Sequence, residues 1–486
     1  MAHHFANKIP TRLLMWQRVR EYAVPPSMIE TATARRAVGD WAGACAAARI
    51  DVDLDLRAVR DRHGTDLVTH LRADLRRLAP DLLRWHMFRI APDGWLRPGL
   101  TISLARYRSS GATPLQLVVR TPPAWADAGQ RMSLALWEGS GNSAPGHHPH
   151  PHPHPHPDRR FRLDLHRHLW DSGRSGELAR RCGAGGARSA APPDRPTVDD
   201  PPWAVGRWAA EAELLLRAEG RPRGAFTVRL GARSRAVLEL VAPDESHAPT
   251  FRPLREALPP QEVAALPALP EASARVPPDL ELLWAGLVTA ERLHPLVAVA
   301  LGASGSAPVA GPGPEPGDPH RVECRGEVHR IAPRDGVLTA IDHDAAQLRR
   351  EELLVALGGP ALPCLRAIDA VHRNPEALPA VRERLGHGDV AGALAVVEGL
   401  LGPGAVLRDG PLREELESAA ARRIDHGLFR SGLVAVHPGA GVAGGGNASG
   451  VGHAEAGHRP RLDRRTPPAM RRKRSSRARP RTGLTC

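Results

Sequence analysis

Six histidines lie close together in one short stretch of the chain, and imidazole is a side chain that binds transition metals. They alternate with prolines between residues 147 and 157. Neutral imidazole binds zinc, nickel and copper, but a defined site needs ligands held in fixed geometry by further partners. A His-Pro repeat provides no such partners. We therefore expect weak, multivalent metal capture and no bound cofactor; the alternative is an extended polyproline-type loop without chemistry. The candidate ligands are His147, His148, His150, His152, His154 and His156.

A run of basic residues near the C-terminus is the second stretch whose side chains could bind a ligand. Residues 459–486 hold eleven basic side chains and one acidic side chain, whereas residues 1–458 hold 55 basic and 52 acidic ones. Such a run can release counterions from a nucleic-acid backbone, but no aromatic residues are interleaved for base stacking. We expect nonspecific nucleic-acid contact at most, with a solvated tail as the alternative. The candidate residues are Arg471, Arg472, Lys473, Arg474, Arg477, Arg479 and Arg481.

Two short motifs combine histidine with carboxylate. In the first, Asp164, His166 and His168 are spaced by two, so they would share one face of a strand. Because no third imidazole or paired acid lies nearby in sequence, we expect surface histidines with ordinary partners. The second motif, residues 342–344 (Asp-His-Asp), stands just before a predicted helix, where Asp344 would be the N-cap. We assign no catalytic residue in either motif.

Other patterns exclude several classes of enzyme. The chain has two lysines, Lys8 and Lys473, and neither is followed by Ser or Thr, so there is no phosphate-binding P-loop. A GxGxxG match at 439–444 runs into further glycines that cannot open a helix, and it does not predict dinucleotide binding. We find no nucleophile elbow and no zinc-protease or deaminase motif. The sequence therefore favours a protein that is not an enzyme.

The cysteines and the hydropathy bear on location. No two cysteines form a CxxC pair, which predicts neither a disulfide framework nor a zinc knuckle. The longest apolar runs, such as 295–301, are too short to span a bilayer, and the N-terminus lacks the apolar core of a signal peptide. We expect a cytoplasmic protein without membrane contact. The cysteines are Cys45, Cys182, Cys324, Cys364 and Cys486.

Hydrophobic periodicity predicts the elements that position these residues. Apolar residues at helical spacing predict helices through most of 1–98, and Ser27 with Glu30 is typical of a capping box. The pattern then changes to alternation, which predicts an antiparallel meander with one solvated face. The four predicted strands are 100–105, 115–120, 132–137 and 161–166, and on this interpretation 139–158 is a long loop between the third and fourth.

Breaks rich in Gly and Pro divide the rest of the chain. The fold class that we predict is α+β, with helical N-terminal and C-terminal segments around the antiparallel β meander. The predicted divisions are 1–98, helical; 99–182, the meander with its His-Pro loop; 183–201, a linker; 202–302, α+β with a hairpin of 226–230 and 237–241; 303–319, a Gly/Pro linker; 320–431, a β-hairpin plus helical module; and 432–486, a disordered Gly/Arg-rich tail.

One eight-residue pattern occurs twice, at 39–46 and at 388–395, with six identical positions. In each copy a Gly predicts a left-handed helix end, and the Asp that follows caps the next helix. The pattern resembles the turn of tetratricopeptide-like α-hairpins, although no repeat of about 34 residues accompanies it. One interpretation is convergent helix-hairpin chemistry in an Ala-rich chain. The other is a pair of helical interaction modules.

The absent catalytic motifs, the nearly neutral body and the helix hairpins together favour a non-catalytic intracellular scaffold or adaptor. Such a protein would act through protein–protein interaction, with partners that the sequence does not identify. Two alternatives stay open: a nucleic-acid-associated protein that uses the basic tail, and an enzyme of unrecognised type.

Overall fold

The computed structural model shows an α+β protein with antiparallel sheets, as the sequence predicted. Residues 1–123 and 131–306 form one compact unit, and residues 124–130 and 307–486 form a second. The boundary falls inside the predicted linker 303–319. The structure describes residues 9–107, 114–139, 156–183, 202–231, 234–241, 248–255, 257–302, 321–324, 326–334, 337–373, 378–402 and 406–431.

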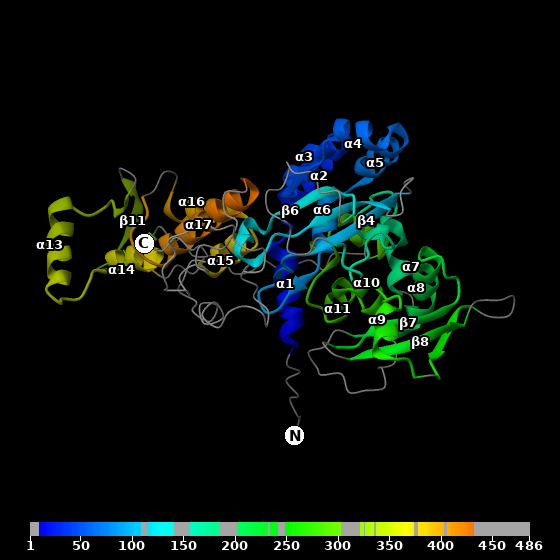
Figure 1. Ribbon diagram of the computed structural model, residues 1–486. Helices are drawn as coiled ribbons and strands as arrows, with labels where there is room; N and C mark the ends of the chain where they lie inside the picture. Colours follow the sequence, from blue (N-terminus) through cyan, green and yellow to red (C-terminus); the bar gives the residue numbers. More distant parts are fainter. Residues whose placement is uncertain are drawn as a thin grey trace, which may run out of the picture. The chain divides into compact units, whose positions relative to one another are not determined.

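The first unit begins with helices, and the predicted helical N-terminal segment is confirmed (Figure 1). The predicted capping box is wrong: α2 begins at Pro26, so Ser27 lies inside its first turn, and Pro25 occupies the N-cap. Proline suits a first helical turn because its fixed φ is already helical. The helices are α1 (Thr11–Tyr22), α2 (Pro26–Ala37), α3 (Trp41–Ala47), α4 (Leu56–His63), α5 (Thr65–Arg77) and α6 (Pro80–Trp85).

The main sheet of this unit has the order β1-β6-β5-β4. Strands β4 (Thr101–Tyr107), β5 (Leu115–Arg120) and β6 (Met132–Trp137) form the predicted antiparallel meander. The fourth member is β1 (Ile50–Asp53), which pairs with β6 in parallel. Strands β4 and β5 bury almost every residue, so the predicted solvated face is wrong.

The predicted fourth strand, 161–166, is also wrong. Asp164 N–H donates to the Ser103 carbonyl at 2.8 Å, but Leu165 and His166 donate to carbonyls three residues back. Those local bonds make turns, so the segment contacts β4 at one bridge and does not form a ladder. A short hairpin of β2 (Arg89–Ile90) and β3 (Trp95–Leu96), and helix α7 (Leu178–Cys182), complete this part.

The remainder of the first unit has its own small core. Helix α8 (Val205–Ala218) packs on a three-stranded antiparallel sheet of β7 (Gly224–Arg229), β8 (Arg235–Val241) and β9 (Thr250–Pro253). The predicted hairpin is thus confirmed, with β9 added. The helices that follow are α9 (Pro260–Ala265), α10 (Glu271–Ala274), α11 (Pro278–Trp284) and α12 (Pro295–Ala300).

The second unit joins a three-stranded antiparallel sheet to helices, where a β-hairpin with helices was predicted for 320–431. Its sheet contains β10 (Arg321–Cys324), β11 (Glu327–Arg334) and β12 (Val337–Ala340). Two short 3-10 turns, Ala124–Ala126 and Ala128–Gln130, also belong to this unit. The helices are α13 (Ala345–Ala356), α14 (Pro363–Arg373), α15 (Leu378–Gly386), α16 (Val390–Leu401) and α17 (Pro411–Ser431).

The two copies of the eight-residue pattern form the predicted helix turns. Gly39 and Gly388 have φ of 79° and 83°. The carboxylate of Asp40 accepts from Gly43 N–H at 2.8 Å, and that of Asp389 accepts from Gly392 N–H at 3.2 Å.

Among the described residues, none of the helices combines the length and the apolar character that a membrane span requires.

Candidate metal centre

Three potential metal ligands come together in the second unit, each at or near the end of a secondary-structure element. Cys324 is the last residue of β10, and His343 lies in the turn between β12 and α13. Cys364 lies in the first turn of α14, directly after Pro363, which suits the first position of a helix. Elements that end at one place in the core thus bring together residues that are distant in sequence.

The ligand atoms of these residues converge. His343 Nε2 lies 3.0 Å from Cys364 Sγ, and Cys364 Sγ lies 3.3 Å from Cys324 Sγ. All three atoms lie within 4.8 Å of one another. A tetrahedral zinc ion bonds sulfur at about 2.3 Å and nitrogen at about 2.0 Å, which sets its ligand atoms about 3.3–3.8 Å apart. The three donors therefore fit a zinc ion after small shifts.

The surroundings of the thiols are apolar. Both cysteines are fully buried, in a core that includes Ile331, Leu338 and Ile368. Burial, and after it the neighbouring Cys324 thiol, raises the pKa of Cys364 to about 11. The thiol therefore keeps its proton near pH 7 unless a cation replaces it, and metal binding at this place would release protons.

A second imidazole, that of His329 on β11, adjoins the group. Its ring stacks on the His343 ring, with centroids 4.1 Å apart and planes 19° apart. Its Nδ1 atom is buried and has no hydrogen-bond partner among the described residues. A buried ring nitrogen without a partner is costly, because it has lost water and gained no hydrogen bond in return.

The other residues of the Asp-His-Asp motif have structural roles. Asp342 accepts from the backbone N–H of Arg330 at 2.7 Å and from its guanidinium at 2.9 Å. These hydrogen bonds lower the pKa of Asp342 to about 2 and tie the His343 turn to β11. Asp344 occupies the predicted N-cap position of α13, but its side chain makes no capping hydrogen bond.

Sequence reasoning missed this group. Forty residues separate Cys324 from Cys364, so no spacing rule of the CxxC kind includes both. The motif that contains His343 was interpreted only as the start of a helix. The one local signal is that each residue lies at or near the end of an element, and this signal becomes informative only when the packing of the elements is known.

Most of the predicted binding residues lie outside the described residues. These are His147, His148, His150, His152 and His154, together with all seven basic residues of the tail, Arg471 to Arg481. His156 is described and exposed, with its ring 6.3 Å from that of Trp137 in an edge contact. Weak metal capture by the His-Pro tract therefore stays a prediction.

The expectation of surface histidines at 166 and 168 is wrong, because both side chains are buried. His166 Nδ1 hydrogen-bonds the Arg162 carbonyl at 2.8 Å, and its Nε2 lies 3.2 Å from Glu211. Burial raises the pKa of Glu211, but the adjacent His166 imidazole and the hydrogen-bonded Arg181 guanidinium outweigh it and lower the pKa to about 2.

Asp164 does not join the two histidines in one site. Its carboxylate accepts two hydrogen bonds from the Arg162 guanidinium, each at 2.8 Å. Arg106 lies 3.3 Å from the same carboxylate. The motif is therefore a set of buried and partly buried ion pairs that anchor the segment after the meander, and the three side chains do not form an acid–base pair for catalysis.

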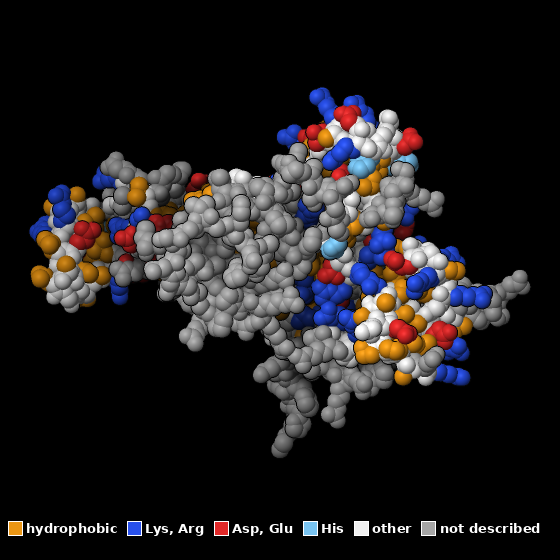
Figure 2. Space-filling view, viewed as in Figure 1, with side chains coloured by type: hydrophobic (Ala, Val, Ile, Leu, Met, Phe, Trp, Pro, Cys, Tyr) orange, Lys and Arg blue, Asp and Glu red, His pale blue; other side chains and the backbone are white. Residues whose placement is uncertain are grey.

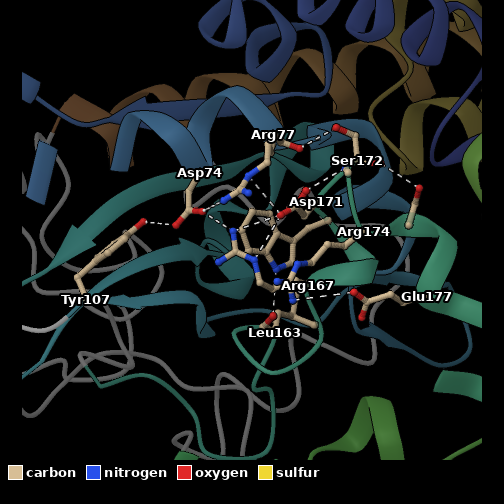
Figure 3. Close-up of polar contacts among 12 residues, drawn as sticks. Asp74, Arg77, Tyr107, Leu163, Arg167, Asp171, Ser172, Arg174 and Glu177 are labelled. Atoms are coloured by element: carbon tan, nitrogen blue, oxygen red, sulfur yellow. Dashed lines mark hydrogen bonds and ion pairs between the residues drawn. The ribbon is translucent and has the colours of Figure 1, made fainter. Parts of the chain in front are cut away.

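A second, partly buried polar network joins helix α5, strand β4 and the segment after the meander (Figure 3). Asp74 accepts hydrogen bonds from Tyr107 at 2.8 Å, from Arg77 at 3.0 Å and from Arg167. Arg167 also bonds Asp171 at 3.2 Å. The donors and acceptors satisfy one another, which favours a structural role in fixing the segment to the helix.

Comparisons of this chain with protein-family models, with curated proteins and with solved structures gave no match. The geometry of the Cys324–His343–Cys364 group therefore carries the functional inference.

Proposed function

We propose that this protein binds one zinc ion through Cys324, His343 and Cys364, and that the ion stabilises the fold of the second unit. The observation that carries the proposal is the convergence of the three ligand atoms within 4.8 Å in a buried core. Thiolate and imidazole are the ligands of structural zinc sites. Hard cations such as magnesium and calcium prefer oxygen ligands, which are absent from this described group.

A structural role fits the positions of the ligands better than a catalytic one. The group joins the end of β10, the turn after β12 and the start of α14, so a bound ion would cross-link three segments. Because such a site does not exist in the unfolded chain, the free energy of metal binding adds to the free energy of unfolding. Both thiols are fully buried, which leaves little access for a substrate.

Zinc content tests the proposal. The full chain is purified without a metal-affinity step and its zinc is measured by mass spectrometry, in parallel with a chain whose residues 147–157 are replaced by Gly and Ser. We expect about one zinc per chain in both. Cys364→Ser should lose the zinc, whereas the control Cys182→Ser, in the other unit, should keep it. Zinc that disappears with the His-Pro tract, or that survives in Cys364→Ser, would contradict the proposal.

The scaffold role is a second candidate function, and an exposed apolar surface on α13 favours it. In this fully described helix, Leu348 alone is buried. Near its C-terminal end Leu353, Leu354 and Leu357 are 64%, 46% and 86% exposed. Figure 2 shows apolar, basic and acidic side chains together on this helix. A cluster of exposed leucines is unusual on a monomer and is typical of an interaction surface.

The charges beside these leucines indicate the partner's chemistry. Arg349 and Arg350 are exposed and lie one helical turn before Leu353 and Leu354, on the same side of the helix. The surface therefore suits an amphipathic helix of a partner protein that carries acidic residues beside its apolar stripe.

Peptide binding tests this second candidate. The probe is a labelled synthetic helix with leucine on one face and glutamate beside it, and fluorescence anisotropy measures its binding to the full chain. Binding should fall at least about tenfold in Leu353→Glu/Leu357→Glu. It should persist in the control Val299→Glu, where the native valine is 71% exposed in the other unit. Equal binding of a lysine version of the peptide, or a stable dimer covering the helix, would contradict the acidic partner.

A further inference from the structure

We infer that His329 is the fourth ligand of this centre, so that the site is a closed Cys2His2 zinc site with no position for a water molecule or a substrate. The inference rests on the metal site proposed above and specifies its composition. The candidate set is Cys324, Cys364, His343 and His329, and His329 is the member that must turn to reach the ion.

Strand pairing places His329 on the correct face of the sheet. In the β10–β11 ladder Cys324 pairs with Glu327, and His329 lies two residues beyond Glu327 on β11. Side chains alternate along a strand, so Cys324, His329 and Ile331 share one face, and Ile331 is buried in the core. Residues in a diagonal pair of this kind lie about 7–8 Å apart, with their Cβ atoms somewhat closer, a separation that a thiol and an imidazole can bridge through a metal.

The state of the imidazole supports the assignment. The His329 ring is already stacked on a ligand ring, at 4.1 Å between centroids, and its Nδ1 atom is buried without a hydrogen-bond partner among the described residues. Rotation of the side chain would exchange the stacking contact for a bond from Nδ1 to the ion. That bond would remove the cost of the unsatisfied nitrogen.

The neighbouring carboxylates suit the fourth position less well. The Asp342 carboxylate is occupied by Arg330, and Glu327 is exposed. Charge gives the same preference. Two thiolates and two neutral imidazoles around Zn²⁺ sum to zero, whereas a carboxylate in place of His329 would leave a net negative charge, which is costly in an apolar core.

Cobalt absorption tests the fourth ligand. The full chain with residues 147–157 replaced by Gly and Ser is titrated with Co²⁺, whose visible bands report four-coordinate tetrahedral geometry and whose near-ultraviolet bands report thiolate bonds. We expect tetrahedral spectra for this chain and for Glu327→Ala, the control on the same strand. His329→Ala should bind Co²⁺ at least about tenfold more weakly, with altered visible bands.

Two further measurements separate loss of a ligand from loss of folding. Added imidazole should restore the tetrahedral bands of His329→Ala, because it can occupy the vacated position. His329→Cys should bind Co²⁺ with stronger thiolate bands than the parent chain. His329→Ala with unchanged affinity and bands would overturn the fourth ligand while leaving the metal site intact. If the chain that differs only by the Gly and Ser replacement binds no Co²⁺, both the metal site and its fourth ligand are overturned.

Discussion

The sulfur atoms of Cys324 and Cys364 lie 3.3 Å apart, although forty residues separate them along the chain. One sulfur ends a strand and the other begins a helix, so neither belongs to a flexible loop that could carry it away. Two thiols at this distance have two possible bridges: a metal ion between them, or a direct disulfide bond. The first occurs where zinc is present, and the second requires an oxidant that takes up two electrons while two protons leave.

The first prediction concerns metal removal. A chelator should make this thiol pair sensitive to oxidised glutathione, because the freed thiols can exchange with it and then form a disulfide with each other. Mass spectrometry of digested protein should detect the Cys324–Cys364 cross-link after chelation and not in the zinc-loaded chain. Equal amounts of cross-link with and without zinc would show that the ion does not contact these sulfurs.

The second prediction compares two glycines with the same backbone conformation. At Gly39 and Gly388, φ is 79° and 83°, so Ala at either position costs about 1 kcal/mol in backbone strain. At Gly388 a Cβ atom would also lie 2.1 Å from the Gly129 carbonyl oxygen, whereas at Gly39 it would meet nothing within 4 Å. Gly388→Ala should therefore lose clearly more stability than Gly39→Ala, as measured by urea unfolding of each unit. Equal losses would contradict the close backbone approach.

The third prediction concerns acid. Burial lowers the pKa of His86 to about 4, although Asp279 opposes the shift, and burial also lowers the pKa of His168. The unfolded chain binds these protons near pH 6.5 and the folded chain does not. The free energy of unfolding is therefore unaffected by these histidines above about pH 6.5 and decreases as the pH falls toward 4. For His86 the decrease is about 3 kcal/mol.

Urea unfolding between pH 7 and pH 4 measures this loss. His86→Gln keeps a hydrogen-bond donor for the Leu82 and Leu169 carbonyls but does not titrate. The free energy of unfolding of His86→Gln should fall less steeply with decreasing pH than that of the unaltered chain. The difference in slope should correspond to the uptake of one proton on unfolding. Parallel curves for the two chains would mean that His86 does not remain neutral when buried.

The fourth prediction concerns the network around Asp74. Asp74→Asn removes the charge that faces Arg167 and should cost about 3 kcal/mol, because it leaves a partly buried guanidinium with less compensation. Tyr107→Phe removes one hydrogen bond and should cost about 1 kcal/mol. Arg77→Ala removes a half-exposed side chain and should cost still less. Chemical denaturation gives all three values, and the reverse order would contradict the network's structural role.

The fifth prediction concerns the basic tail. Deleting residues 459–486 should abolish retention of the protein on immobilised DNA at low salt, because these residues carry eleven basic side chains. Retention of the full chain should fall steeply as salt rises, as counterion release requires. If the shortened chain is retained equally well, nucleic-acid contact does not depend on the tail.

Local rules predicted much of the fold. The glycine–aspartate turns before α3 and α16, the hairpin of β7 and β8, and the helices of the second unit follow from spacing within a few residues. The main failures come from contacts between distant segments. Residues 161–166 alternate like a strand but form turns, whereas β1, which lies inside the predicted helical segment 1–98, completes the sheet through its pairing with β6. Neither outcome is encoded within a single window of sequence.

The candidate metal site could not be predicted from the sequence for the same reason. Cys324, His343 and Cys364 meet because β10 and β12 end, and α14 begins, at one point in a core. A pattern in a single sequence does not report where the ends of distant elements lie in space. His329 gave no signal on its own, since a lone histidine on a strand has many ordinary roles.

The short segment 124–130 has a consequence for how the chain is made. Although β5 and β6 of the first unit flank it, it belongs to the second unit, where Trp125 contacts Phe429 and the Ala126 carbonyl accepts from His426. Three hundred residues separate that last pair, so at ribosomal speed the segment waits about 15–60 seconds for its partner helix to be synthesised. A fragment that starts at residue 307 would never acquire it. The second unit is therefore built from two separate stretches of the chain, and it can be completed only near the end of translation.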